Sequence, residues 1–108
     1  MKRIILVIIL GALGLSGCAR HYYRVEADTL HIYLKNAAAK KIYFSCSLDR
    51  FEMHPAQKID FETWRVSLPA GREFTYFYMA DEEVFLPACR FSELDDFGSR
   101  NCVFIPGQ

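Results

Sequence analysis

The sequence lacks an excess of charge of one sign, since its 108 residues include 13 lysines and arginines and 13 aspartates and glutamates. A nucleic-acid-binding domain concentrates basic charge in a patch or stripe, so this balance argues against nucleic acid as a partner. No second long apolar run follows the first 15 residues, which argues against a membrane protein with several spans. The 52% hydrophobic and 15% aromatic content is not typical of a disordered chain.

The sequence also has no residue pattern that marks a reactive site. No Cys-x-x-Cys pair occurs, and the three histidines lie in unrelated contexts, so neither a zinc site nor a cysteine nucleophile is predicted. The segment Asp95-Asp96-Phe97-Gly98 lacks the oxygen-ligand spacing of a calcium loop and is interpreted as a turn. No carboxylate pair is marked for glycoside hydrolysis. We therefore expect no enzyme activity, no cofactor and no metal.

An export signal opens the chain. Lys2 and Arg3 precede an apolar run over residues 4–10, and small residues lead to Leu-Ser-Gly-Cys at 15–18. A basic region, an apolar region and a small-residue cleavage site are the pattern of a secretory signal. Removing residues 1–17 leaves 91 residues with 11 basic and 13 acidic side chains, which is enough for one domain.

The residues around Cys18 resemble a bacterial lipobox, at which lipoprotein signal peptidase cuts before a lipidated cysteine. This resemblance implies attachment of acyl chains, such as palmitate, at Cys18. The alternatives are an ordinary signal peptide with a chance cysteine, or an uncleaved anchor, although residues 4–15 are short of the ~20 that span a bilayer. Because Ala19 stands where an aspartate would favour the inner membrane, the resemblance implies an outer-membrane protein that faces the periplasm.

Three cysteines remain after lipidation of Cys18, and an exported chain meets an oxidising compartment, so one disulfide is expected. We favour Cys89–Cys102, because the turn at 95–98 can bring the two cysteines together. Cys46 shares an apparent strand face with Ile42 and would remain a buried thiol. Cys46–Cys102 is the alternative pairing.

The mature chain is predicted to form one β-sandwich. Residues 18–28 are interpreted as the lipidated cysteine and a short tether, and 29–108 as the domain. Alternating apolar residues predict strands over 29–34, 41–47, 63–68, 73–79, 84–86 and 102–105. Residues 36–40 are interpreted as a connection, and the turn at 69–71 is expected to pair the third and fourth strands as a hairpin. Short antiparallel strands in a chain of this length favour an immunoglobulin-like sandwich.

A family resemblance rests on six landmarks in order. They are the segments 42–51, Thr-Trp-Arg-Val at 63–66, Leu-Pro-Ala-Gly at 68–71, and the segments 74–81, 84–87 and 95–103. Their order resembles the early-set immunoglobulin-like domain of isoamylases, which is also the glycogen-binding domain of the AMP-activated protein kinase beta subunit (carbohydrate-binding module family 48). The resemblance implies that Trp64 is a buried strand residue.

The same resemblance places a carbohydrate site at four positions. Phe51 and Val84 stand where glycogen-binding members have tryptophans, Phe77 stands at a lysine position, and Asn101 matches the family residue type. Phe51 either caps one end of the sandwich or binds ligand. Because Phe77 and Val84 have the wrong chemistry for a sugar platform, the resemblance supports the fold more strongly than the site.

Two functions follow. One is an envelope-anchored, non-catalytic module with weak carbohydrate binding. The other is a structural or assembly lipoprotein whose sandwich docks an envelope protein. An exposed aromatic beside a hydrogen-bonding residue would favour a sugar ligand, and an unpaired edge strand or an apolar patch would favour a protein.

Overall fold

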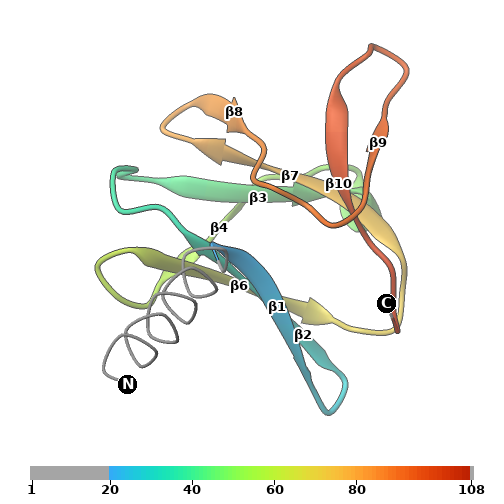
Figure 1. The fold of residues 1–108 in the computed structure, drawn as a ribbon, viewed down its shortest axis with the longest axis horizontal. Coiled ribbons are helices and arrows are strands. Elements are labelled where there is room, and N and C mark those ends of the chain that lie inside the picture. The colour runs from blue at the N-terminus through green and yellow to red at the C-terminus, as the bar shows by residue number, and fades with distance from the viewer. Residues whose placement is uncertain (1–19, 108) are drawn as a thin grey trace, which may run out of the picture.

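The computed structural model describes residues 20–107, which form two antiparallel sheets packed as a sandwich (Figure 1). The strands are β1 (His21–Glu26), β2 (Thr29–Lys35), β3 (Ile42–Cys46), β4 (His54–Pro55), β5 (Gln57–Lys58), β6 (Thr63–Pro69), β7 (Phe74–Ala80), β8 (Glu83–Phe85), β9 (Ser92–Leu94) and β10 (Arg100–Phe104), with a 3-10 turn, η1 (Ser47–Asp49). No helix within residues 20–107 is long and apolar enough to cross a bilayer. The predicted signal segment 1–17, Cys18 and Ala19 lie outside the described residues.

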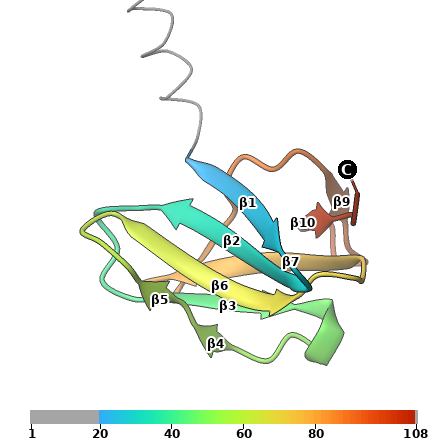
Figure 2. The same ribbon diagram turned by 90° about the horizontal axis from the view of Figure 1, so that it is seen from below.

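The four-stranded sheet has the order β1-β2-β6-β5, as Figure 2 shows. The six-stranded sheet has the order β4-β3-β7-β10-β9, and β8 pairs with β7. All the strand pairs are antiparallel. The prediction of an all-β, immunoglobulin-like antiparallel sandwich is confirmed.

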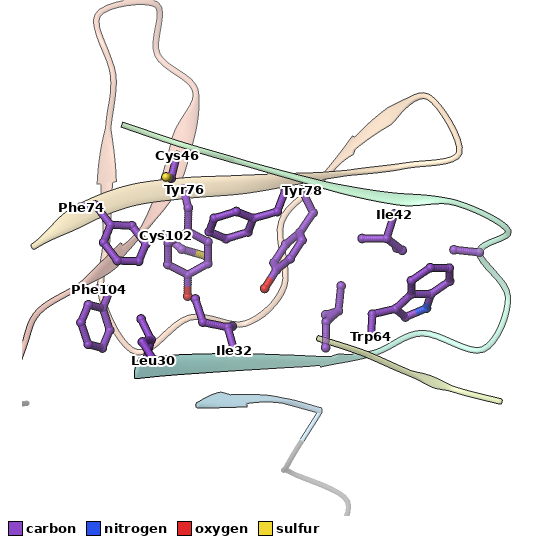
Figure 3. Close-up of a cluster of buried hydrophobic side chains, with 13 residues drawn as sticks. Leu30, Ile32, Ile42, Cys46, Trp64, Phe74, Tyr76, Tyr78, Cys102 and Phe104 are labelled. Carbon is purple, nitrogen blue, oxygen red and sulfur yellow. The ribbon is translucent and has the colours of Figure 1, made fainter. Parts of the chain in front are cut away.

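Strand alternation builds the core between the two sheets. In β2, Leu30, Ile32 and Leu34 are buried while their neighbours are half-buried. Across the sandwich β7 contributes three aromatic residues, Phe74, Tyr76 and Tyr78 (Figure 3). Because successive strand side chains point to opposite faces, each sheet supplies one apolar face, and burying the two faces against each other stabilises both.

Trp64 lies in this core, as expected. Its side chain is only 5% exposed, and its indole Nε1–H donates a hydrogen bond of 2.9 Å to the backbone carbonyl of Asn36. The cation of Lys58 lies 5.4 Å from the ring centroid on the other side. Packing and hydrogen bonding thus both fix the indole.

The predicted tether over 18–28 is wrong from His21 onward. His21–Glu26 forms β1, which pairs with β2 along its whole length, from His21 opposite Leu34 to Glu26 opposite Thr29. A positive φ of 55° at Ala27 allows the tight turn between the strands. The charged residues in this segment face solvent because β1 lies at the edge of its sheet, so they do not oppose strand formation.

The hairpin expected between the third and fourth predicted strands does not form. β6 pairs with β2 and β5, whereas β7 pairs with β3, β10 and β8, so residues 70–73 cross from one sheet to the other. The apolar face of β7 is buried against the sheet that contains β6. If β6 and β7 formed a hairpin, they would lie in the same sheet, and their apolar faces could not pack against each other.

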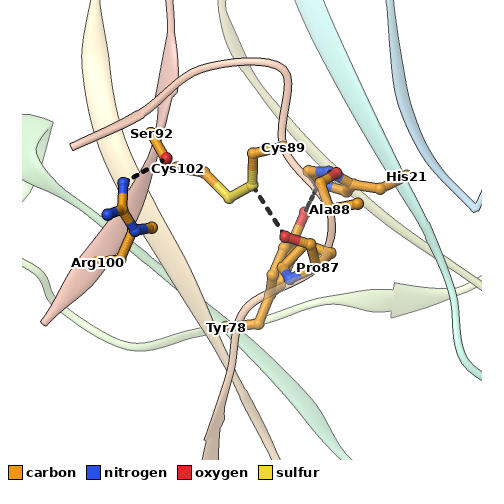
Figure 4. The surroundings of a disulfide bond; sticks show 8 residues. All are labelled: His21, Tyr78, Pro87, Ala88, Cys89, Ser92, Arg100 and Cys102. Atoms are coloured by element: carbon orange, nitrogen blue, oxygen red, sulfur yellow. Dashed lines mark hydrogen bonds between the residues drawn. A yellow bond between two sulfur atoms is a disulfide. The ribbon is translucent and has the colours of Figure 1, made fainter.

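Cys89 and Cys102 form a disulfide with their Cα atoms 5.7 Å apart, within the range that such bonds require (Figure 4). The favoured pairing is confirmed, and Cys46 is a free, buried thiol. Burial raises the pKa of the Cys46 thiol, which therefore stays protonated and behaves as a small apolar residue. The disulfide joins the segment after β8 to the middle of the last strand, β10.

Candidate functional site

The four positions that the family resemblance singled out lie on one surface, the outer face of the six-stranded sheet. We call this surface the β7 face and define it by Tyr43, Phe51, Phe77, Met79, Val84 and Asn101. In register, Met79 of β7 lies between Tyr43 of β3 and Val84 of β8. These three residues form a row across three strands, on the side opposite the buried residues of β7.

Phe51 and Phe77 form the centre of the β7 face. Their ring centroids are 5.9 Å apart and the ring planes are inclined by 22°, so the rings stack. Phe51 follows η1 with a φ of 62°, and its N–H donates to the carbonyl of Cys46 at 2.8 Å. This turn folds Phe51 back over the sheet. One face of its ring is therefore covered by Phe77, while 39% of the side chain remains exposed.

Val84 of β8 and Asn101 of β10 both lie on the side of β7 opposite β3. Val84 is 67% exposed and is the most solvent-accessible apolar residue of the β7 face. Asn101 precedes the buried Cys102 in β10, so its half-buried side chain points to the outer face. Cys102 is opposite Tyr76 in this antiparallel pair. The residue before it, Asn101, therefore lies level with the residue after Tyr76, which is Phe77.

The chemistry of the β7 face is apolar. Its six defining residues are uncharged at neutral pH, and an amide and a phenol are their only side-chain hydrogen-bonding groups. Tyr43 and Met79 were not among the sequence candidates, although their positions in alternating strands indicated the outer face. A surface of this kind suits contact with apolar groups better than recognition of many hydroxyls.

A second feature is a groove between β1 and β10. We call it the β1–β10 groove; it has a volume of about 470 Å³ and is lined by His21, Tyr23, Tyr76, Phe91, Val103 and Phe104, among others. The ring of Tyr23 meets that of Phe104 edge to face at 5.1 Å. This groove was not predicted, because residues 18–28 were interpreted as a tether, although His-Tyr-Tyr-Arg-Val-Glu at 21–26 contains several good strand formers.

His21 lines the β1–β10 groove and links β1 to residues of the other sheet and of the segment before the disulfide (Figure 4). Its Nδ1 lies 3.4 Å from the carbonyl of Ala88 and its Nε2 lies 3.0 Å from the hydroxyl of Tyr78. Since a carbonyl can only accept, Nδ1 carries the proton and Nε2 accepts from Tyr78. Burial lowers the pKa of His21, with an opposing contribution from the Ala88 carbonyl, and raises the pKa of Tyr78 well above its usual value. Both groups therefore stay neutral near pH 7.

The described residues contain no group of three or more His, Cys, Asp or Glu side chains placed to hold a metal ion. The Asp95 carboxylate accepts the N–H groups of Phe97 and Ser99 at 2.9 Å each, and Gly98 has a φ of 84°. The segment interpreted as a turn is therefore a turn, with its first aspartate engaged by the backbone. Elsewhere, His54 hydrogen-bonds Asp49, and this bond is the main reason that the pKa of Asp49 lies below its usual value.

Comparison with known proteins adds no relative. No protein-family model matches the chain, and no curated protein shows a significant match to it.

Proposed function

We propose that the chain is an envelope lipoprotein whose sandwich is a non-catalytic module that docks on an envelope protein. The observation that carries this proposal is the apolar character of the β7 face, which the exposed Glu93 borders opposite Asn101. Exposed apolar patches mark interaction surfaces, and aromatic and methionine side chains are enriched at protein interfaces. Phe51, Met79 and Val84 supply these groups, from a turn and two paired strands. The partner would present a complementary apolar surface that lacks charge.

The proposed anchor would hold the sandwich close to the membrane. β1 begins at His21, three residues after Cys18. Even a fully extended chain of that length spans only about 11 Å. A lipid on Cys18 would therefore keep the domain against the bilayer, and the docking partner would be a membrane protein or a protein bound at the same surface.

Replacing Cys18 with serine is expected to abolish acylation and to leave unprocessed precursor, because the acyl group is attached through the cysteine thiol. Intact-mass analysis of the membrane fraction measures this directly. Changing Cys46 to serine is the control and should leave the acylated mass in place. A mature, membrane-bound wild-type protein without acyl chains would contradict the anchor.

Changing Val84 to aspartate is expected to weaken docking by at least tenfold, because a buried interface does not tolerate an unpaired charge. The detergent-solubilised complex, separated by native electrophoresis, should shift to the size of the free lipoprotein. Phe61→Asp is the matched control: Phe61 is 75% exposed and lies in the connection between β5 and β6, away from the β7 face. If the complex remains intact in Val84→Asp but dissociates in Phe61→Asp, the interface does not lie on the β7 face.

Weak carbohydrate binding is the second candidate, and one observation favours it. Phe51 offers an exposed aromatic ring on the face that also carries the Asn101 amide, which are the two kinds of group that hold a pyranose. Retention of the protein on glycogen should then be weak and should depend on Phe51 and Asn101. Retention that is lost in Phe51→Ala, together with an undisturbed complex in Val84→Asp, would favour this candidate over protein docking, whereas tight retention unaffected by Phe51→Ala would contradict the site.

A further inference from the structure

β1 is the outermost strand of the four-stranded sheet, and in the part of the chain that the structure describes it pairs with β2 alone (Figure 2). The N–H of Lys35 donates to the carbonyl of Arg20 at 2.9 Å, so Arg20 and Lys35 are a hydrogen-bonded pair. This pair determines which of the following residue pairs of β1 and β2 are hydrogen-bonded to each other. In an antiparallel ladder, hydrogen-bonded pairs alternate with pairs that make no bond to each other. Arg24 therefore bonds to β2, whereas the N–H and C=O groups of His21 and Val25 point to the open edge.

The β1–β10 groove lies along this edge. The six-stranded sheet continues past β10 to β9, whereas the four-stranded sheet stops at β1, which contacts β10 through Tyr23 and Phe104. The groove therefore lies where a fifth strand of the smaller sheet would lie. Its lining is largely apolar, with Phe91 and Val103 on the β10 side, and Val25 at the edge is 48% exposed. An added strand would cover these side chains with every second residue of its own.

The charges around the edge are mainly positive. Strand alternation places Arg20 and Arg24 on the outer face of β1, and Arg90 lines the groove. Glu26 is the one acidic residue of β1, and it lies 3.7 Å from Arg24 in an exposed pair that contributes little. A strand that pairs with β1 would meet arginines at the positions that face outward.

We propose that β1 accepts an extended segment of another protein as a fifth strand of the smaller sheet, with apolar residues facing the groove and acidic residues facing outward. Main-chain hydrogen bonds at an open sheet edge supply affinity in this mode, and alternate side chains supply specificity. The β1 edge is separate from the β7 face, so this inference does not depend on the proposed docking surface.

The probe is a blocked seven-residue peptide of alternating valine and glutamate, added to the full mature protein in detergent micelles. NMR amide exchange should slow at least tenfold at Val25 when the peptide binds. Exchange at Arg24 should change little, because its N–H already bonds to β2. A peptide of alternating valine and lysine is the control and should bind at least tenfold more weakly.

Two variants test the mode of binding. Val25→Pro removes the outward N–H without removing a β1–β2 bond, and an edge position tolerates proline. Val25→Pro should weaken binding of the valine–glutamate peptide at least tenfold, whereas Val25→Thr, which keeps the N–H, should leave binding unchanged. Arg24→Glu, at an exposed site on the outer face of β1, should weaken binding of this peptide and strengthen binding of the lysine peptide. The proposal would be overturned by any of four results. These are unchanged peptide binding in Val25→Pro, equal binding of both peptides, protection of the Val25 amide by dimerisation without peptide, and peptide-induced shifts confined to the β7 face.

Discussion

Replacing Trp64 with alanine is expected to lower the free energy of unfolding by about 3–5 kcal/mol, the range for truncating a buried aromatic side chain. The indole is almost fully buried, and its removal would also leave the carbonyl of Asn36 without its donor. A typical domain is stable by only ~5–15 kcal/mol, so the loss is a large fraction of the total. Urea unfolding followed by far-UV circular dichroism measures it, because the variant has no tryptophan to report by fluorescence.

Two further variants define the source of the Trp64 effect. Trp64→Phe retains much of the packing and loses only the hydrogen bond, so its loss of stability should be intermediate. Phe61→Ala removes an aromatic side chain that is mostly exposed three residues earlier, and it should change the unfolding free energy by about 0.5 kcal/mol or less. A Trp64→Ala protein as stable as Phe61→Ala would refute the core role of the indole.

Removing the disulfide is expected to cost about 3 kcal/mol, since it closes a loop with a sequence separation of 13 between Cys89 and Cys102. For a domain of this size that corresponds to a fall of roughly 12–24 °C in Tm. Calorimetry of wild type with and without reductant gives the difference. The double variant Cys89→Ala/Cys102→Ala is the better genetic test, because alanine at the fully buried position 102 introduces no polar group.

The control for the disulfide is Cys46→Ala, which removes a buried thiol but no crosslink. Its Tm should still fall when reductant is added, whereas that of the double variant should not. Peptide mapping of the wild-type protein without reduction should show Cys46 as an alkylated free thiol. A crosslinked peptide that contains Cys46 would contradict the observed pairing.

The sequence predicted most of the core strands because their burial is regular. Alternation in 29–34 and 73–79 indicates one apolar face, and both segments form strands with that face buried. The segment 21–26 was not predicted as a strand because this edge strand buries little and carries an arginine and a glutamate, so its alternation is weak. The hairpin was wrongly predicted for a different reason. Residues 69–71 favour a turn, but a turn alone does not determine whether the chain returns beside β6 or crosses to the other sheet.

The candidate site could be predicted only in part. Strand positions such as Phe77 and Val84 have an outer or inner face that alternation sets, so their common face follows from the register. Phe51 follows a 3-10 turn and has a positive φ, and its place over Phe77 depends on a backbone conformation that strand periodicity does not encode. The β1–β10 groove depends on which strands end up at the sheet edges, and edge positions follow from the whole topology.

The contact between the first and last strands sets the order in which this chain can fold. Tyr23 of β1 packs on Phe104 of β10, and the two residues are separated by nearly the entire domain. Contacts between residues so far apart in sequence are slow to form, because a long loop must close before they contribute stability. Because the chain is synthesised from its amino terminus, it cannot complete its sandwich until its last strand is available. Until then the aromatic residues of β7 lack part of their cover, such as the contact of Phe74 with Phe104.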